Sequence, residues 1–123
     1  MRLSVSGDRV NVGPQLREYI DRHLYFALGR FSSAIDHVDV RVGDVNGPRG
    51  GVDKRCRILV KLRAGGSDSI TIEQDDESLN SAVARAAARA GRTVGRSLDR
   101  RHRKRAYQRR RALAKGLREN GDR

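Results

Sequence analysis

The sequence predicts an α+β fold, a two-layer sandwich in which two helices cover one face of a four-stranded sheet. Three observations carry this prediction. Four segments alternate apolar and polar residues, which is typical of strands with one buried face. Two segments carry apolar residues at helical spacing, and the segments follow one another in the order β-α-β-β-β-α. The 123 residues leave room for one such domain.

The four expected strands cover residues 2–7, about 37–44, about 54–64 and a short segment around Ile70 and Ile72. In the two central strands one set of alternating side chains is apolar and therefore expected to be buried. These side chains are Val38, Val40, Val42, Cys56, Ile58, Val60 and Leu62. Residues 45–51 and 65–68 are rich in glycine and have the composition of loops.

The first helix is expected to begin at Pro14, since proline suits the first helical position, and to end near Ser32 and Ser33. Its apolar stripe consists of Leu16, Tyr19, Ile20, Leu24, Ala27, Leu28 and Phe31. The second helix follows Glu77, and either Ser78 or Asp76 is suited to cap its N-terminus. Its apolar stripe consists of Leu79, Val83, Ala86, Ala87, Ala90, Val94 and Leu98.

Positive charge is concentrated in the last part of the chain. The formal net charge is +12, of which residues 1–76 carry +1 and residues 77–123 carry +11. A strongly basic chain is expected to bind an acidic partner, and nucleic acid is the commonest one. The alternative is that the basic residues only aid solubility.

The arginines of the second helix form a pattern that we call the arginine stripe. At about 100° per residue, they fall within a sector roughly 80° wide, away from the apolar face. The stripe consists of Arg85, Arg89, Arg92, Arg96, Arg100 and Arg103. No acidic residue shares this sector, and like charges at this spacing repel one another. Guanidinium groups bind phosphates well, so the stripe predicts a nucleic-acid contact; a solvated helix face is the alternative.

Other candidate sites are weaker. The polar face of the sheet would carry Arg41, Arg55, Arg57, Lys61 and Arg63, but these alternate with carboxylates, so the sequence does not decide whether that face binds anything. Tyr25 lies off the apolar stripe and is suited either to base stacking or to a half-covered surface. We expect no catalytic group, metal site or cofactor, because the histidines lie on different elements and the single cysteine, Cys56, is on a buried face. No apolar run is long enough to span a membrane, and we expect a cytoplasmic location.

Particular residues resemble the ribosome hibernation-promoting factor family, also called ribosome-associated inhibitors. They include Ser6-Gly7, Leu16-Arg17-x-Tyr19-Ile20 and Leu79-x-Ser81-Ala82-Val83, the last leading into Arg89, Arg92 and Arg96. The resemblance covers about residues 2–100 and looks like a short, divergent form. It implies a ribosome-binding domain over residues 1–105. The basic tail over residues 106–123 would then extend the helix or be disordered.

The resemblance implies that the protein binds the small ribosomal subunit and its rRNA, blocks the channel used by mRNA and tRNA, and preserves idle ribosomes. The positions that match the basic residues of the family are Arg22, Arg85, Arg89, Arg92 and Arg96. We expect no enzyme activity, no small-molecule substrate and no separate dimerisation domain. The oligomeric state stays open. The alternatives are a general binder of double-stranded RNA or DNA, and a module that binds an acidic protein.

Overall fold

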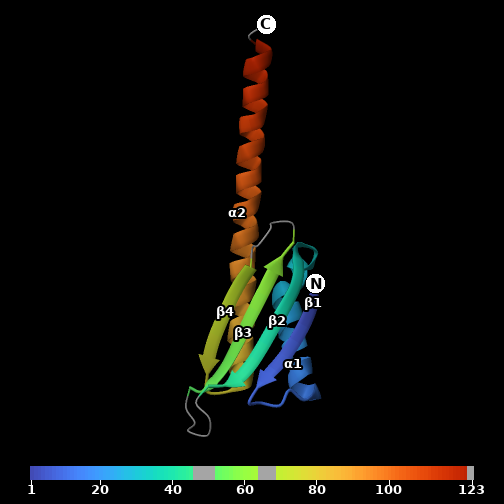
Figure 1. Cartoon of the computed structure of the whole chain (residues 1–123), viewed down its shortest axis with the longest axis vertical. Coiled ribbons are helices and arrows are strands. Elements are labelled where there is room, and N and C mark those ends of the chain that lie inside the picture. Colours follow the sequence, from blue (N-terminus) through green and yellow to red (C-terminus); the bar gives the residue numbers. More distant parts are fainter. Residues whose placement is uncertain (46–51, 64–68, 122–123) are drawn as a thin grey trace.

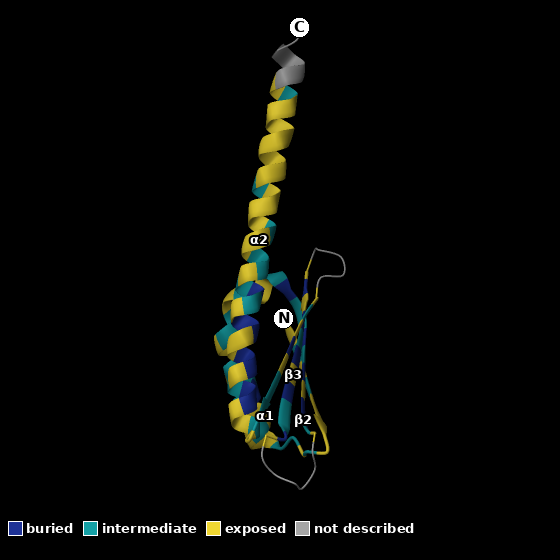
Figure 2. Ribbon diagram, turned by 90° about the vertical axis from the view of Figure 1, so that its left-hand side faces the viewer, coloured by how far each residue is buried: buried dark blue, intermediate teal, exposed yellow. Residues whose placement is uncertain are grey.

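The computed structural model describes residues 1–45, 52–63 and 69–121, with backbone alone for residues 118–121. Along the chain the elements are β1 (Arg2–Asp8), α1 (Pro14–Leu28), the 3-10 helix η1 (Gly29–Ala34), β2 (Ile35–Asp44), β3 (Lys54–Leu62), β4 (Ser69–Asp76) and α2 (Leu79–Gly121). The two helices lie together on one face of the sheet (Figure 1; Figure 2). The predicted α+β sandwich with β-α-β-β-β-α order is confirmed. The loops expected at residues 45–51 and 65–68 fall almost entirely outside the described residues.

The sheet has the strand order β1-β2-β3-β4. β1 pairs with β2 in parallel, from Arg2 opposite His37 to Asp8 opposite Gly43. Two parallel neighbours need a crossover connection, which α1 and η1 supply. The pairs β2–β3 and β3–β4 are antiparallel. Because α1 and α2 both cover the same face, the other face of the sheet stays open to solvent.

The core lies between the sheet and the helices, where the alternation of the sequence places it. Every apolar residue expected on the inner face of β2 and β3 is buried, with at most 2 % of its surface exposed. From α1 the core takes Ile20, Leu24 and Leu28, which stand one helical turn apart. From α2 it takes Ala82, Val83, Ala86, Ala87, Ala90 and Val94. The small size of these residues lets α2 lie close to its neighbours.

The first helix is shorter than its apolar spacing suggests. It begins at Pro14 as expected but ends at Leu28, and the chain continues through the 3-10 helix η1. Phe31 therefore belongs to η1, although it still packs against the core. Gly29 is a weak helix former, and the serines that follow it favour hydrogen bonds to the local backbone over a regular helix.

The second helix is capped by Ser78, whose Oγ accepts a hydrogen bond from the backbone N–H of Ser81 at 3.1 Å. The other candidate, Asp76, accepts from the N–H of Glu77 before the helix begins. The helix runs for 43 residues and projects beyond the sheet (Figure 1). The basic segment after Arg105, whose order the sequence left open, is helical as far as Gly121. Nearly all of the projecting part with described side chains is exposed (Figure 2).

The two helices run parallel and side by side. Tyr19 of α1 donates a hydrogen bond to the carbonyl oxygen of Asn80, near the start of α2. Further along, Ala27 lies against Gly91 and Phe31 against Gly95. The two helices therefore form one continuous layer, and side chains from both contribute to its outer surface.

Candidate nucleic-acid interface

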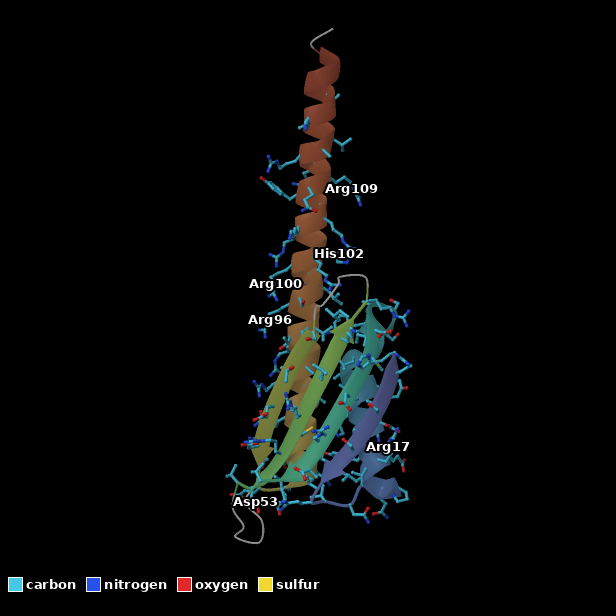
Figure 3. All side chains as sticks on the ribbon, in the orientation of Figure 1. Arg17, Asp53, Arg96, Arg100, His102 and Arg109 are labelled. Carbon is cyan, nitrogen blue, oxygen red and sulfur yellow. The ribbon has the colours of Figure 1, made fainter. Side chains whose placement is uncertain are left out.

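All six residues of the arginine stripe are exposed in the structure. Since the opposite side of α2 carries Val83, Ala90 and Val94 into the core, packing fixes the rotation of the helix and turns the stripe outward. Arg96 and Arg100 project from one side of α2, whereas Arg109 projects from the other (Figure 3). Arg96 and Arg100, two residues of the stripe, therefore lie on the same side of the helix.

The two arginines at the N-terminal end of the stripe are held against β4. Arg89 donates from Nη1 to the carbonyl oxygen of Glu73 at 2.8 Å and to Oε1 of Gln74 at 3.0 Å. Arg85 lies 3.4 Å from Oδ2 of Asp76. The expectation that no carboxylate pairs with the stripe is therefore wrong at Arg85. Helical spacing reveals only partners on the same helix, and Asp76 comes from the end of a strand.

The other four arginines of the stripe have no partner among the residues that the structure describes. Within the described residues, Arg92, Arg96, Arg100 and Arg103 make no hydrogen bond and no ion pair. They are spaced by one turn of the helix, and like charges at this spacing destabilise it slightly. An external polyanion would relieve this repulsion.

Arg22 lies apart from the stripe, on α1. Its side chain is 71 % exposed and stands 4.0 Å from the carboxylate of Glu18, one turn earlier. The structure therefore places it on the same helical layer as the stripe but gives it a local counter-ion. An exposed pair of this kind contributes little to stability, so Arg22 can exchange Glu18 for another anion at small cost.

The open face of the sheet carries mixed charge. Arg55 donates to Asp75 through two hydrogen bonds of 2.7 and 3.0 Å and lies 3.3 Å from Glu73. This pairing raises the pKa of Arg55 and lowers the pKa of Asp75. Lys54, at the start of β3 and not on the open face, pairs with Asp44 and with the buried Asp53. Of the cations expected on the open face, Arg55 therefore belongs to an internal ion pair of the fold.

The projecting part of α2 carries cations on every side. Besides the end of the stripe, they include Arg101, Lys104, Arg105, Arg109, Arg110 and Arg111. Arg101 donates a hydrogen bond to the carbonyl oxygen of Arg63 at 3.0 Å, which ties the start of this segment to the end of β3. After Arg103, the positive charge surrounds the helix and does not form a stripe.

The described residues hold neither a reactive cysteine nor a cluster of metal ligands. Burial raises the pKa of the Cys56 thiol to about 12, which suppresses its reactive thiolate. The described part of the chain contains no cluster of metal-ligating side chains. His37 instead pairs with Asp36 at 3.2 Å, and this hydrogen bond lowers the pKa of the carboxyl. Among the described helices, none is both long and apolar enough to cross a bilayer.

Sequence reasoning missed Phe26, which is 92 % exposed. Its neighbour Tyr25 is 54 % exposed and lies off the core, as expected. The helical positions of Ile20 and Leu24 already place residue 26 off the buried stripe. A large apolar side chain outside that stripe is the signal that could have found it.

A family model described as Sigma 54 modulation protein / S30EA ribosomal protein matches residues 3–102. The chain belongs to this family. The match confirms the family that the sequence resembles, a group of ribosome-associated translation modulators. The match ends within α2, and residues 103–123 lie outside it.

Two solved structures share the S30EA-type fold of this chain. The N-terminal domain of Thermus thermophilus Protein Y is 23 % identical, with a TM-score of 0.64, covering 78 % of this chain and 98 % of that one. A ribosomal subunit interface protein from Coxiella burnetii is 17 % identical, with a TM-score of 0.66, covering 80 % and 99 %. No curated protein sequence matches this chain significantly.

Proposed function

We propose that this protein binds the small ribosomal subunit through its rRNA and blocks the channel for mRNA and tRNA. The observation that carries the proposal is the row of four exposed arginines, Arg92 to Arg103, that have no partner among the described residues of a chain in the S30EA family. The Coxiella burnetii protein of similar fold is itself named a ribosomal subunit interface protein.

The chemistry suits a phosphate backbone. Each guanidinium is planar and can donate two parallel hydrogen bonds to one phosphate. Because the four arginines stand on a rigid helix, their spacing is set before binding, and little ordering entropy is lost. Arg85 and Arg89 contact β4 in this structure, and Arg22 pairs with Glu18; in the complex we assign them to the edges of the contact.

The mode of action is steric. A folded domain held in the path of mRNA and tRNA excludes them without any bond being made or broken. The proposal therefore needs no catalytic group, cofactor or small-molecule substrate, and it places the protein in the cytoplasm, where ribosomes work. The α+β body, described over residues 1–105 apart from its two loops, would occupy the site. The helix after residue 105 would extend from it.

A second candidate is general binding of double-stranded RNA or DNA. The cations on every side of the projecting part of α2 favour it, since such a surface attracts any polyanion without regard to sequence. The two candidates differ in selectivity. A ribosome-specific protein stays on small subunits when random duplex is present in excess, and a general binder is displaced.

The test uses charge reversal on two faces. The double variant Arg92→Glu and Arg96→Glu is compared with Arg41→Glu and Lys61→Glu, which makes the same charge change on exposed residues of the open sheet face. We expect the first variant to lose co-sedimentation with small subunits and inhibition of a translation extract, and the second to retain both. Equal behaviour of the two variants, or displacement of the wild type by random duplex, would refute the proposal.

A further inference from the structure

A groove of about 450 Å³ runs between α1 and α2. Its volume lies within the range of about 300–1,000 Å³ typical of small-molecule sites. The floor is apolar and consists of Ala27, Ala84, Ala87, Ala88 and Gly91. All of these residues are alanine or glycine, so no side chain fills the groove, and its floor is a flat apolar surface.

At the floor of the groove, α1 and α2 are in close contact at Gly91. A Cβ atom on this residue would lie 2.9 Å from the carbonyl oxygen of Ala27, closer than a carbon atom can approach it without displacement. Packing therefore holds α1 and α2 at a fixed separation, and the groove is part of the folded structure before any ligand arrives.

An exposed aromatic ring stands at the rim. Phe26 lines the groove yet is 92 % exposed, and no described residue covers it. Exposed apolar surface beside an apolar floor is typical of a binding site. Tyr25, the residue before Phe26 in α1, does not line the groove and therefore serves as a control.

The remaining groups of the rim are cationic or neutral. Arg30 and Arg92 line the groove together with His23, and no carboxylate of the described residues does. Arg30 is held in place by its own stacking, with the guanidinium carbon 4.6 Å from the centre of the Phe31 ring. A ligand that fits this surface combines a flat apolar group with a negative charge, and a nucleotide has this combination.

We propose that the groove takes the base of an unpaired nucleotide, stacked on Phe26, while an adjacent phosphate binds Arg92. This inference rests on the proposed function, because Arg92 belongs both to the groove and to the arginine stripe. Arg96 follows one turn later, so a strand whose phosphates track the stripe passes the open side of the groove. Unpaired bases are commonly bound by stacking on aromatic side chains.

The competing occupant is an apolar side chain from an acidic protein segment. It would use the same floor and the same cations but would not need an aromatic ring at the rim. A base stacks on Phe or Trp and stacks poorly on Leu, whereas an aliphatic side chain packs on any of the three. The two occupants therefore respond differently to substitution at residue 26.

The first experiment measures affinity for two RNA probes by fluorescence anisotropy. One is a stem-loop with unpaired adenines in its loop, and the other is the same stem as a blunt duplex. We expect Phe26→Leu to weaken stem-loop binding roughly ten-fold, since stacking on an aromatic side chain contributes about that much, and to leave duplex binding unchanged. Phe26→Trp keeps both affinities, and Tyr25→Leu changes neither. Because Phe26 is exposed, all variants should fold.

The stripe variant Arg96→Glu with Arg100→Glu separates this inference from the proposed function. It leaves the groove intact and should weaken binding of both probes. If it weakens neither, the proposed function fails, while the contrast between Phe26→Leu and Tyr25→Leu still decides the groove. Equal effects of Phe26→Leu on both probes, no effect on either, or no binding of the stem-loop by the wild type would overturn the inference.

The second experiment identifies the occupant on small subunits. Phe26 is replaced by the photoreactive p-benzoylphenylalanine, and the complex is irradiated. We expect a cross-link to rRNA at a nucleotide that is unpaired. A cross-link to a ribosomal protein would assign the groove to a peptide, and a complex that forms without any cross-link would leave the groove empty; either result overturns the inference.

Discussion

Replacing Gly91 by alanine should destabilise the fold, although the same substitution in a helix normally stabilises it. The added Cβ would lie 2.9 Å from the carbonyl oxygen of Ala27 and 3.4 Å from its Cβ. The oxygen belongs to the backbone of α1, so relief of the contact requires the helices to separate. Overpacking costs about 1–3 kcal/mol, and the gain in helix propensity returns about 1 kcal/mol. The net loss is about 1 kcal/mol.

Urea unfolding followed by circular dichroism measures this loss. With a slope of about 2 kcal/mol per molar urea, a loss of about 1 kcal/mol lowers the midpoint by about 0.5 M. Gly95→Ala is the matched control on the same helix. Its Cβ would meet only the tip of the Phe31 ring, at 3.3 Å, and a ring can shift. Because this contact is easily relieved, the gain in helix propensity of about 1 kcal/mol should dominate, and the midpoint should stay at that of the wild type or rise by up to about 0.5 M.

A third glycine isolates the intrinsic gain. Gly116 has no atom within 4 Å of an added Cβ, so Gly116→Ala should raise the helix signal without any packing cost. A midpoint for Gly91→Ala that equals or exceeds the wild type would refute the reasoning, because it would show that the helices separate at no cost. The spacing of the groove would then not be set by this contact.

Three further predictions concern charge and length. Replacing Arg96 and Arg100 by glutamine should reduce the slope of log K against log salt for RNA binding by roughly 1.4–1.8; an unchanged slope would remove both residues from the contact. Asp75→Asn should lower stability by roughly 0.5–1 kcal/mol at neutral pH. Because pairing with Arg55 lowers the pKa of Asp75, that difference should disappear as the pH falls through this lowered pKa, and a difference that persists in strong acid would contradict the pairing. Truncation after Arg105 should lower the helix signal but not the unfolding midpoint of the body, since the removed side chains that are described lie mostly exposed; a lowered midpoint would show that the projecting helix supports the core.

Local pattern was sufficient for most of the fold. A strand with one buried face must alternate, so Val38, Val40 and Val42 revealed both their strand and its inner side. The preference of proline for the first helical position placed Pro14 at the start of α1, and helical spacing placed the arginines on one side of α2. The end of α1 was harder to predict, because Phe31 keeps the apolar spacing while the backbone around it changes to a 3-10 helix.

The binding surface was predictable only in part. Helical spacing revealed which arginines share a face, but not that Asp76 approaches Arg85 or that β4 accepts hydrogen bonds from Arg89. These partners belong to β4 and not to the helix, so they meet the arginines only when the sheet packs against α2. The groove beside Phe26 was also not predictable from the sequence, because it forms only where α1 and α2 pack together.

The sequence alone determined the element order, the inner face of each strand and the cationic side of α2, since each follows from the periodicity of a single segment. Tertiary structure decided which of those cations keep an unoccupied guanidinium and where an apolar floor opens beside them. Both depend on distances between segments that the chain brings together only on folding, and no local period encodes such distances.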